Sequence, residues 1–149
     1  MDNKQSFLEE IKGAFGCGEK DIRTYSPLTL AYIGDDVFDI IIRTLVVEKA
    51  NRPANELHKM TVKYVKAQTQ AGMAEALLAC ENFLSDEEVD VYKRGRNAKS
   101  YTYAKNASIQ DYRRATGFEA LLGYVYLQGK QSRVVEIVKK AIELMDMEF

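Results

Sequence analysis

Two acidic residues, Asp35 and Glu119, each interrupt a stretch of mostly apolar sequence. Asp35 lies in LAYIGDDVFDIIIR, where it shares a helical stripe with Leu28, Tyr32 and Ile42. Glu119 is the only charged residue on its helical face in ATGFEALLGYVYL. Burying a carboxylate without a partner costs several kcal/mol, so we expect a compensating group near each acid.

Two kinds of compensation fit this pattern. Carboxylates from two helices can share a hard divalent cation such as Mg²⁺, which takes oxygen ligands and usually keeps several waters. Such a cation could activate water at a phosphodiester. Alternatively, each carboxylate forms a local ion pair, with Arg43, Lys63 or Arg113 as partners. The patterning alone does not choose between a metal site and ion pairs.

Two glycines favour a shared site. Gly34 directly precedes Asp35, and Gly123 follows Glu119 by one helical turn. Glycine costs about 1 kcal/mol in a helix interior unless close approach of another segment requires it. We therefore expect both carboxylates to lie beside close helix contacts.

The net charge of −1 is unevenly distributed. Residues 93–114 carry a net charge of +6, which leaves −7 for the remainder of the chain. A cation-rich segment is often only a solvated face, but this one ends just before the Glu119 helix, as expected if it leads phosphates toward that site. The bases are Lys93, Arg94, Arg96, Lys99, Lys105, Arg113 and Arg114.

Apolar residues recur at helical spacing along most of the chain, which predicts an all-α helical bundle. Ser26-Pro27, Ser85 with Glu88, and Ser108 are typical of helix N-termini. Helices are expected at about 28–49, 54–79, 85–94, 108–128 and 132–145, with a basic loop at 95–107.

The composition, 46% hydrophobic and 29% charged, predicts one folded domain over residues 1–149, with 1–25 as an N-terminal extension that carries a short helix. Cys17 and Cys80 form no CxxC pair and indicate neither a disulfide framework nor a zinc site. The N-terminus is unlike a signal peptide, and no apolar run reaches the roughly 18 residues of a membrane span. We therefore expect a cytoplasmic protein that does not contact membranes.

LAYIGDDVFD followed by FEALLGYVYL resembles the paired motifs of the ribonuclease III catalytic domain. NELHK, KAQTQA and KRGRNAKS extend the resemblance to Mini-ribonuclease III, whose members lack a double-stranded-RNA-binding domain. The resemblance implies an all-helical homodimer that uses Mg²⁺ to hydrolyse double-stranded RNA, leaving 5′-phosphate and 3′-hydroxyl ends. It also implies precursor 23S ribosomal RNA as substrate, and a ribosomal protein is a further possible partner.

By the same resemblance, Asp35 and Glu119 match the catalytic, metal-binding acids of the motifs. The basic loop and a helix around His58 match RNA-contacting elements. Taken by itself, the lone histidine is more often a surface residue than a catalyst. The expected RNA-binding residues are His58, Lys59, Lys93, Arg94, Arg96, Asn97, Lys99 and Lys105.

The chain departs from full-length ribonuclease III at two of its four acidic positions, where Ala31 and Thr116 stand. The short subfamily generally has small or hydroxyl residues there, and fewer acids leave the number of metal ions open. Thr116 and Asp39 are candidates for indirect support of the metal, as is Asp36, although Asp36 points off the Asp35 stripe.

Two other functions remain open from the sequence. A non-catalytic RNA-binding module for ribosome assembly would explain the basic segment but not the retention of Asp35 and Glu119. A helical nucleotide phosphohydrolase would also use acidic metal ligands, although such enzymes usually carry denser acidic clusters. Metal-dependent cleavage of duplex RNA distinguishes these alternatives.

Overall fold

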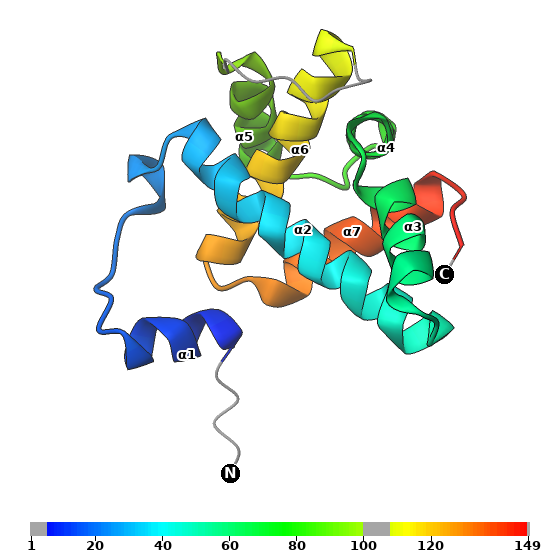
Figure 1. Cartoon of the computed structure of the whole chain (residues 1–149). Coiled ribbons are helices and arrows are strands. Elements are labelled where there is room, and N and C mark those ends of the chain that lie inside the picture. The colour runs from blue at the N-terminus through cyan, green and yellow to red at the C-terminus, as the bar shows by residue number, and fades with distance from the viewer. Residues whose placement is uncertain (1–5, 100–107, 149) are drawn as a thin grey trace.

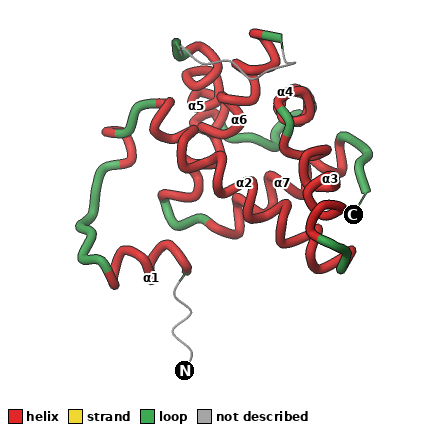
Figure 2. The backbone as a smooth tube through the Cα atoms, viewed as in Figure 1, coloured by secondary structure: helices red, strands yellow, loops and turns green. Residues whose placement is uncertain are grey.

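The computed structural model describes residues 6–99 and 108–148, and the regular elements in these ranges are all helices (Figures 1 and 2). The predicted all-α fold is confirmed. The elements are α1 (Phe7–Ala14), the 3-10 helix η1 (Ile22–Thr24), α2 (Pro27–Ala50), α3 (Ala54–Val65), α4 (Ala67–Ala79), α5 (Asp86–Asn97), α6 (Ile109–Leu127) and α7 (Gln131–Leu144).

Helix α6 lies at the centre of the bundle, between α2, α4, α5 and α7 (Figure 1). Its buried side chains include Phe118, whose ring meets the ring of Phe38 from α2 edge to face at a centroid distance of 5.3 Å. Ile42 and Ile137 complete this part of the core and are fully buried. The burial of α6 on several sides explains why a charged residue in its apolar stretch, Glu119, is unusual.

Serine caps begin the three helices whose starts the sequence predicts from serine motifs, and Ser6 caps α1 in the same way. The hydroxyls of Ser26 and Ser108 accept hydrogen bonds from backbone amides of the first turn. Ser85 and Glu88 form the full reciprocal capping box at α5. These interactions satisfy amide groups that have no partner inside the helix, which explains why short sequence motifs located the helix starts.

The single helix expected over 54–79 is wrong, because the chain breaks at Lys66 into α3 and α4. Lys66 has extended backbone angles, with ψ at 152°. The Thr69 hydroxyl donates to the Lys63 carbonyl at 2.8 Å, and the Gln70 amide donates to the Val65 carbonyl at 2.7 Å. These two side chains replace backbone hydrogen bonds that a continuous helix would have made.

The basic loop expected from Gly95 begins later, because α5 continues to Asn97. Gly95 is buried where α5 crosses α6, and a methyl group in its place would lie 2.7 Å from the Cβ of Ala120 and 3.0 Å from the Cα of Gly117. The glycine that indicated a loop therefore permits close helix packing instead. Residues 100–107 of the expected loop lie outside the described residues.

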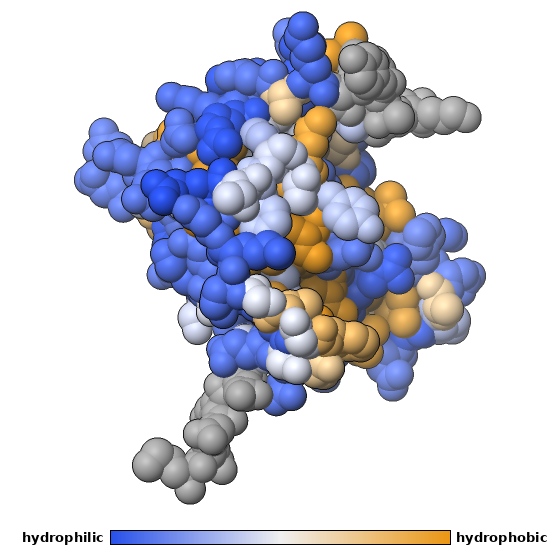
Figure 3. All heavy atoms as spheres, turned by 90° about the vertical axis from the view of Figure 1, so that its left-hand side faces the viewer, coloured by the Kyte–Doolittle hydropathy of each residue, from blue (hydrophilic) through white to orange (hydrophobic). Residues whose placement is uncertain are grey.

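Helix α1 stands apart from the other helices at the lower left of Figure 1, and none of its residues is buried. Its Phe7 is 75% exposed, and Phe15, which follows the helix, is 80% exposed. The face shown in Figure 3 is mostly hydrophilic, with an apolar patch among the polar side chains. Among the described residues, no helix is both long and apolar enough to cross a membrane.

Candidate active site

Helices α2 and α6 cross in backbone contact beside the two unusual acids. A methyl group at Gly34 would lie 1.7 Å from the backbone carbonyl oxygen of Glu119, and one at Gly123 would lie 2.0 Å from that of Leu30. No side chain larger than hydrogen fits at either position without moving a helix backbone. The predicted close contacts beside Asp35 and Glu119 are therefore confirmed.

The crossing places Asp35 and Glu119 on one pocket of about 370 Å³. Asp35 itself is exposed, so the expectation that it would be buried is wrong. Helix α2 buries the face that carries Leu30, Gly34 and Phe38, and Asp35 lies about 100° further round the helix, at the pocket mouth. The remaining lining residues are Leu28, Ala31, Tyr32, Asp36, Tyr112 and Thr116.

The pKa of the Glu119 carboxyl is far above its usual value. Burial, together with hydrogen bonding and charge from Asp35, raises the pKa of its carboxyl to about 9, although the Gln70 side chain acts in the opposite direction. At neutral pH without a cation, Glu119 therefore holds a proton beside Asp35. Two carboxyl groups this close disfavour double ionisation, and a divalent cation relieves that repulsion.

No ion pair reaches Asp35 or Glu119 within residues 6–99 and 108–148. Arg43, one of the proposed partners, donates to Asp39 at 2.9 Å instead. Asp39 does not line the pocket that holds Asp35 and Glu119. Asp36 does line this pocket, although it lies off the helical stripe of Asp35. The local ion-pair explanation of the two acids therefore has no support in the described structure.

Thr116 stands beside Glu119 with its hydroxyl already oriented. It is 8% exposed, and its Oγ1 donates to the Tyr112 carbonyl at 2.9 Å. The hydroxyl hydrogen is thus used within α6, and the oxygen lone pairs can accept from a water in the pocket. Thr116 can support a hydrated ligand at this position without adding charge.

The basic residues of α5 divide between two sides of the helix. Arg94 lines a pocket with the acidic residues Asp86, Glu87 and Asp90, whereas Arg96 lines a separate pocket of about 300 Å³. Lys93 and Lys99 are exposed, and Lys105 lies outside the described residues. The other residues that line the Arg96 pocket are Glu75, Asn97, Gln110, Arg113 and Arg114.

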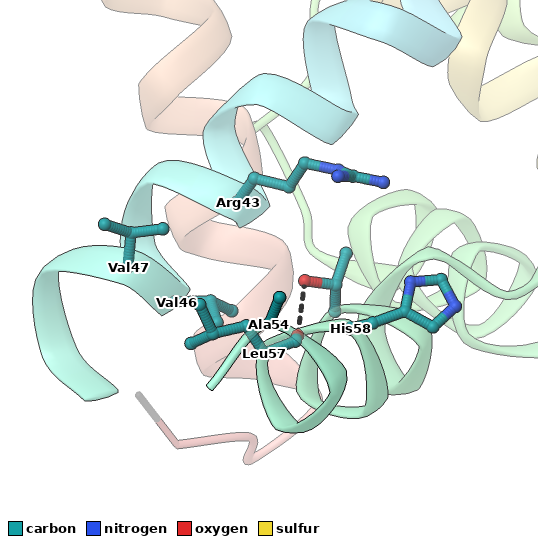
Figure 4. Close-up of a pocket in the computed structure, with 7 residues that line it drawn as sticks. Arg43, Val46, Val47, Ala54, Leu57 and His58 are labelled. Atoms are coloured by element: carbon teal, nitrogen blue, oxygen red, sulfur yellow. Dashed lines mark hydrogen bonds between the residues drawn. The ribbon is translucent and has the colours of Figure 1, made fainter. Parts of the chain in front are cut away.

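His58 and Lys59 are exposed on α3, away from the pocket that holds Asp35 and Glu119. His58 lines a small hollow of about 170 Å³ between α2 and α3, together with Arg43. Figure 4 shows both side chains extending to the same side of these helices. His58 is thus placed for surface contact and not for chemistry at the carboxylates.

Sequence reasoning missed Gln70, which reaches Glu119 from α4, and the gathering of Arg113 and Arg114 with Arg96. A signal for Gln70 was available, because an uncharged polar residue in the apolar stretch of α4 needs buried partners. The arginine grouping depends on the packing of α5 against α6, which spacing along one helix does not reveal.

Comparison with known proteins agrees with this geometry. The ribonuclease III domain model matches residues 28–130. The chain is 47% identical to a Mini-ribonuclease 3 of Clostridium tetani over 86% of this chain and 83% of that protein. It is 44% identical to a Mini-ribonuclease 3 of Staphylococcus aureus over 86% and 95%.

A solved structure shares the fold. The crystal structure of protein FN1578 from Fusobacterium nucleatum superposes with a TM-score of 0.73 at 30% identity, covering 84% of this chain and 98% of that one. The sequence matches extend through both helices that carry the pocket acids. The chain therefore belongs to the ribonuclease III family, in its Mini-ribonuclease 3 group, and is an endoribonuclease.

Proposed function

We propose that this endoribonuclease hydrolyses double-stranded RNA at Asp35 and Glu119 in a Mg²⁺-dependent reaction that leaves 5′-phosphate and 3′-hydroxyl ends. The observation that carries the proposal is the meeting of two carboxyl groups across the α2 and α6 crossing, with the pKa of Glu119 raised to about 9. A fold gains no stability from forcing two acids together, so the arrangement is explained by a ligand that needs both.

The donor atoms fit a hard divalent cation. Asp35 and Glu119 offer carboxylate oxygens, and Mg²⁺ is commonly bound by one or two carboxylates with several retained waters. The described residues hold no cluster of three or more acids, histidines and cysteines, so the remaining ligands would be water and RNA phosphate oxygens. When bound, such a cation lowers the pKa of a coordinated water and stabilises charge at the phosphodiester.

The protein side chains have separate tasks in this proposal. Asp35, exposed at the pocket mouth, meets the RNA and the cation from the solvent side. Glu119 would hold the cation from the less exposed side, and to do so its carboxyl would have to give up the proton that its raised pKa retains in the metal-free protein. Thr116 orients water through its oxygen, and the crossing at Gly34 keeps both acids at a fixed separation. Asp36 is placed to contact the hydrated part of the site.

The RNA backbone would be held by the basic end of α5 and α6. Arg96, Arg113 and Arg114 line one pocket, and Arg114 is paired with Glu75 at 3.2 Å. Arg113 precedes Glu119 by six residues on the same helix, which corresponds to about 9 Å along the helix axis and about 120° round it. Phosphates bound there would lead toward the carboxylates from a neighbouring side of α6. Further donors near the same end come from Asn97, Lys93, Lys99 and Arg94. A more distant part of the duplex would be contacted by His58, Lys59 and Arg43.

A homodimer is part of the proposal, because a two-fold axis would present two equivalent sites to opposite strands of a duplex. On α2, Tyr32 is 81% exposed and Ile40 is 63% exposed, which supports an interface along this helix. Ile42 on α2 and Met73 on α4 are fully buried within the subunit and cannot contribute to such an interface. Sedimentation of the protein as a dimer, and dissociation by Ile40→Asp, would test the interface.

Precursor 23S ribosomal RNA is the proposed substrate in the cell, with a ribosomal protein as a candidate partner and the cytoplasm as the site of action. Free Cys17 and Cys80 are compatible with a reducing compartment. Cleavage of a precursor 23S transcript at one position, compared with an unrelated duplex of equal length, tests this choice of substrate. Equal cutting of both duplexes, with and without purified ribosomal proteins, would contradict it.

The decisive experiment uses a long RNA duplex labelled at its ends. Wild type should cut it with Mg²⁺ and not with EDTA, should spare the same strand when single, and should leave ends that accept a 5′ label only after phosphatase treatment. Asp35→Asn and Glu119→Gln should each lower cutting at least a hundredfold, whereas Asp90→Asn, the same change at an exposed acid of α5, should not. Full activity of Asp35→Asn would refute the assigned site.

A further inference from the structure

One acidic residue lies among the arginines of the candidate RNA-binding pocket. Glu75 of α4 lines this pocket, and the other lining residues are Arg96, Asn97, Gln110, Arg113 and Arg114. A phosphodiester offers negatively charged oxygens that only accept hydrogen bonds, so the Glu75 carboxylate repels the group that the three arginines would bind. A pocket for phosphate alone would gain nothing from a glutamate in its wall.

Two of the pocket arginines are held by contacts within the protein. The guanidinium carbon of Arg96 lies 5.6 Å from the centroid of the Tyr92 ring, and Tyr92 is 1% exposed. The Nε of Arg114 lies 3.2 Å from the Oε1 of Glu75. Helices α4 and α5 both pack against α6, which fixes the three walls relative to one another. The pocket is therefore largely arranged before a ligand binds.

The ion pair between Glu75 and Arg114 is a weak explanation for the glutamate. The two side chains are 54% and 38% exposed, and water screens a pair at this level of exposure so that it adds little to stability. Helix α4 is held to α6 by the shared apolar core, to which Leu77 and Phe118 belong. The Glu75 carboxylate is thus accessible, and folding does not depend on it.

The chemistry of the carboxylate defines what it can bind. An ionised carboxylate only accepts hydrogen bonds and has about four lone-pair sites, of which the contact with Arg114 uses one. A ligand group on Glu75 must therefore be a donor. Within an RNA backbone that donor is the ribose 2′-hydroxyl, which is attached to the carbon next to the one that carries the 3′-phosphate. A-form RNA displays these hydroxyls along its wide, shallow minor groove.

We propose that Glu75 is a specificity-determining residue: its carboxylate accepts a hydrogen bond from a ribose 2′-hydroxyl while the three arginines of the pocket bind the adjoining phosphates. This inference rests on the proposed duplex RNA function and names the group of the substrate that the pocket recognises. DNA has the phosphates and lacks the hydroxyl, so it meets the repulsion from Glu75 without the hydrogen bond. The pocket thereby selects RNA over DNA, and it does so away from Asp35 and Glu119, which do not line it.

The test compares the binding of two forms of one duplex, measured by fluorescence anisotropy in EDTA so that no strand is cut. One form is RNA, and the other carries 2′-fluorine in place of every hydroxyl, which keeps the A-form shape and the phosphates. Wild type should bind the RNA form at least tenfold more tightly, as expected for one hydrogen bond to a charged group. Glu75→Leu should lower this ratio about tenfold. Glu75→Gln keeps an uncharged acceptor and should give an intermediate ratio.

The ratio separates recognition of the hydroxyl from a change of charge. If Glu75 only holds Arg114, Glu75→Leu changes the affinity for both duplexes by the same factor and leaves the ratio at its wild-type value. Glu87→Leu is the matched control, because it removes an exposed glutamate from the pocket that Arg94 lines, and its ratio should equal that of wild type.

The outcomes distinguish this inference from the function on which it rests. A wild-type ratio in Glu75→Leu, or equal binding of the two duplexes by wild type, would overturn the role of Glu75 and leave duplex RNA binding intact. Failure of wild type to bind either duplex would refute the duplex RNA function and the inference together. Thermal melts of Glu75→Leu should match those of wild type closely, because the side chain is exposed.

Discussion

Replacing Gly34 with alanine tests whether the backbone contact of α2 and α6 sets the active site. The added methyl would lie 1.7 Å from the Glu119 carbonyl oxygen, so the helices must separate by roughly the same amount to reach ordinary contact. Overpacking of this kind costs about 3 kcal/mol, and the better helix propensity of alanine returns about 1 kcal/mol. The net loss of about 2 kcal/mol corresponds to a fall in Tm of about 4–8 °C.

The effect on cleavage should exceed the effect on stability. A displacement of about 1 Å between catalytic groups can cost on the order of a hundredfold in rate, and Gly34→Ala changes the separation of Asp35 and Glu119 directly. Gly72→Ala is the matched control, because the new methyl meets only the flexible end of Met145. Thermal melts and single-turnover cleavage of duplex RNA measure both quantities. Gly34→Ala with wild-type rate and raised Tm would refute the reasoning.

Three further predictions concern charge. In the metal-free protein, the pKa of Glu119 is raised to about 9, so the folded state binds the proton more tightly than the unfolded state does. The stability that protonated Glu119 contributes is therefore complete below the pKa of this group in the unfolded chain, and it is lost as pH rises toward 9. Melts of wild type and Glu119→Gln should diverge in favour of the variant between pH 5 and 9, and parallel curves would contradict the shift. Although burial opposes it, hydrogen bonds from Arg133 and Ser85 hold the pKa of Glu88 below its usual value, so the stability that this group contributes is lost as pH falls through that pKa. Arg133→Met should therefore lower the free energy of unfolding by about 3 kcal/mol in urea at pH 7, and a wild-type value would show that the pair contributes little. Lys99→Ala should reduce the salt dependence of duplex RNA binding by about one phosphate contact, a change of about 0.9 in the log–log slope, whereas Lys139→Ala on α7 should leave the slope unchanged. An unchanged slope for Lys99→Ala would place the RNA elsewhere.

The helix starts and the close contacts could be read from the sequence because they depend on short-range chemistry. Ser26, Ser85 and Ser108 cap residues within the next turn, and a glycine inside an apolar helix indicates close approach wherever the partner lies. The same reasoning failed at Lys66, where two side chains compete with the backbone for carbonyl groups. It also failed at Gly95, where a packing glycine looked like the start of a loop.

The sequence by itself identified Asp35 and Glu119 as acids in apolar surroundings, because residue type and helical spacing are local properties. Only the tertiary structure decided that Glu119 is the less exposed acid and Asp35 the more exposed one, that Arg94 and Arg96 face different pockets, and that Gln70 is buried and affects the pKa of Glu119. Each of these depends on which face of a helix meets which neighbour. The packing of α2, α4 and α5 around α6 fixes those faces, and periodicity along one helix leaves them undetermined.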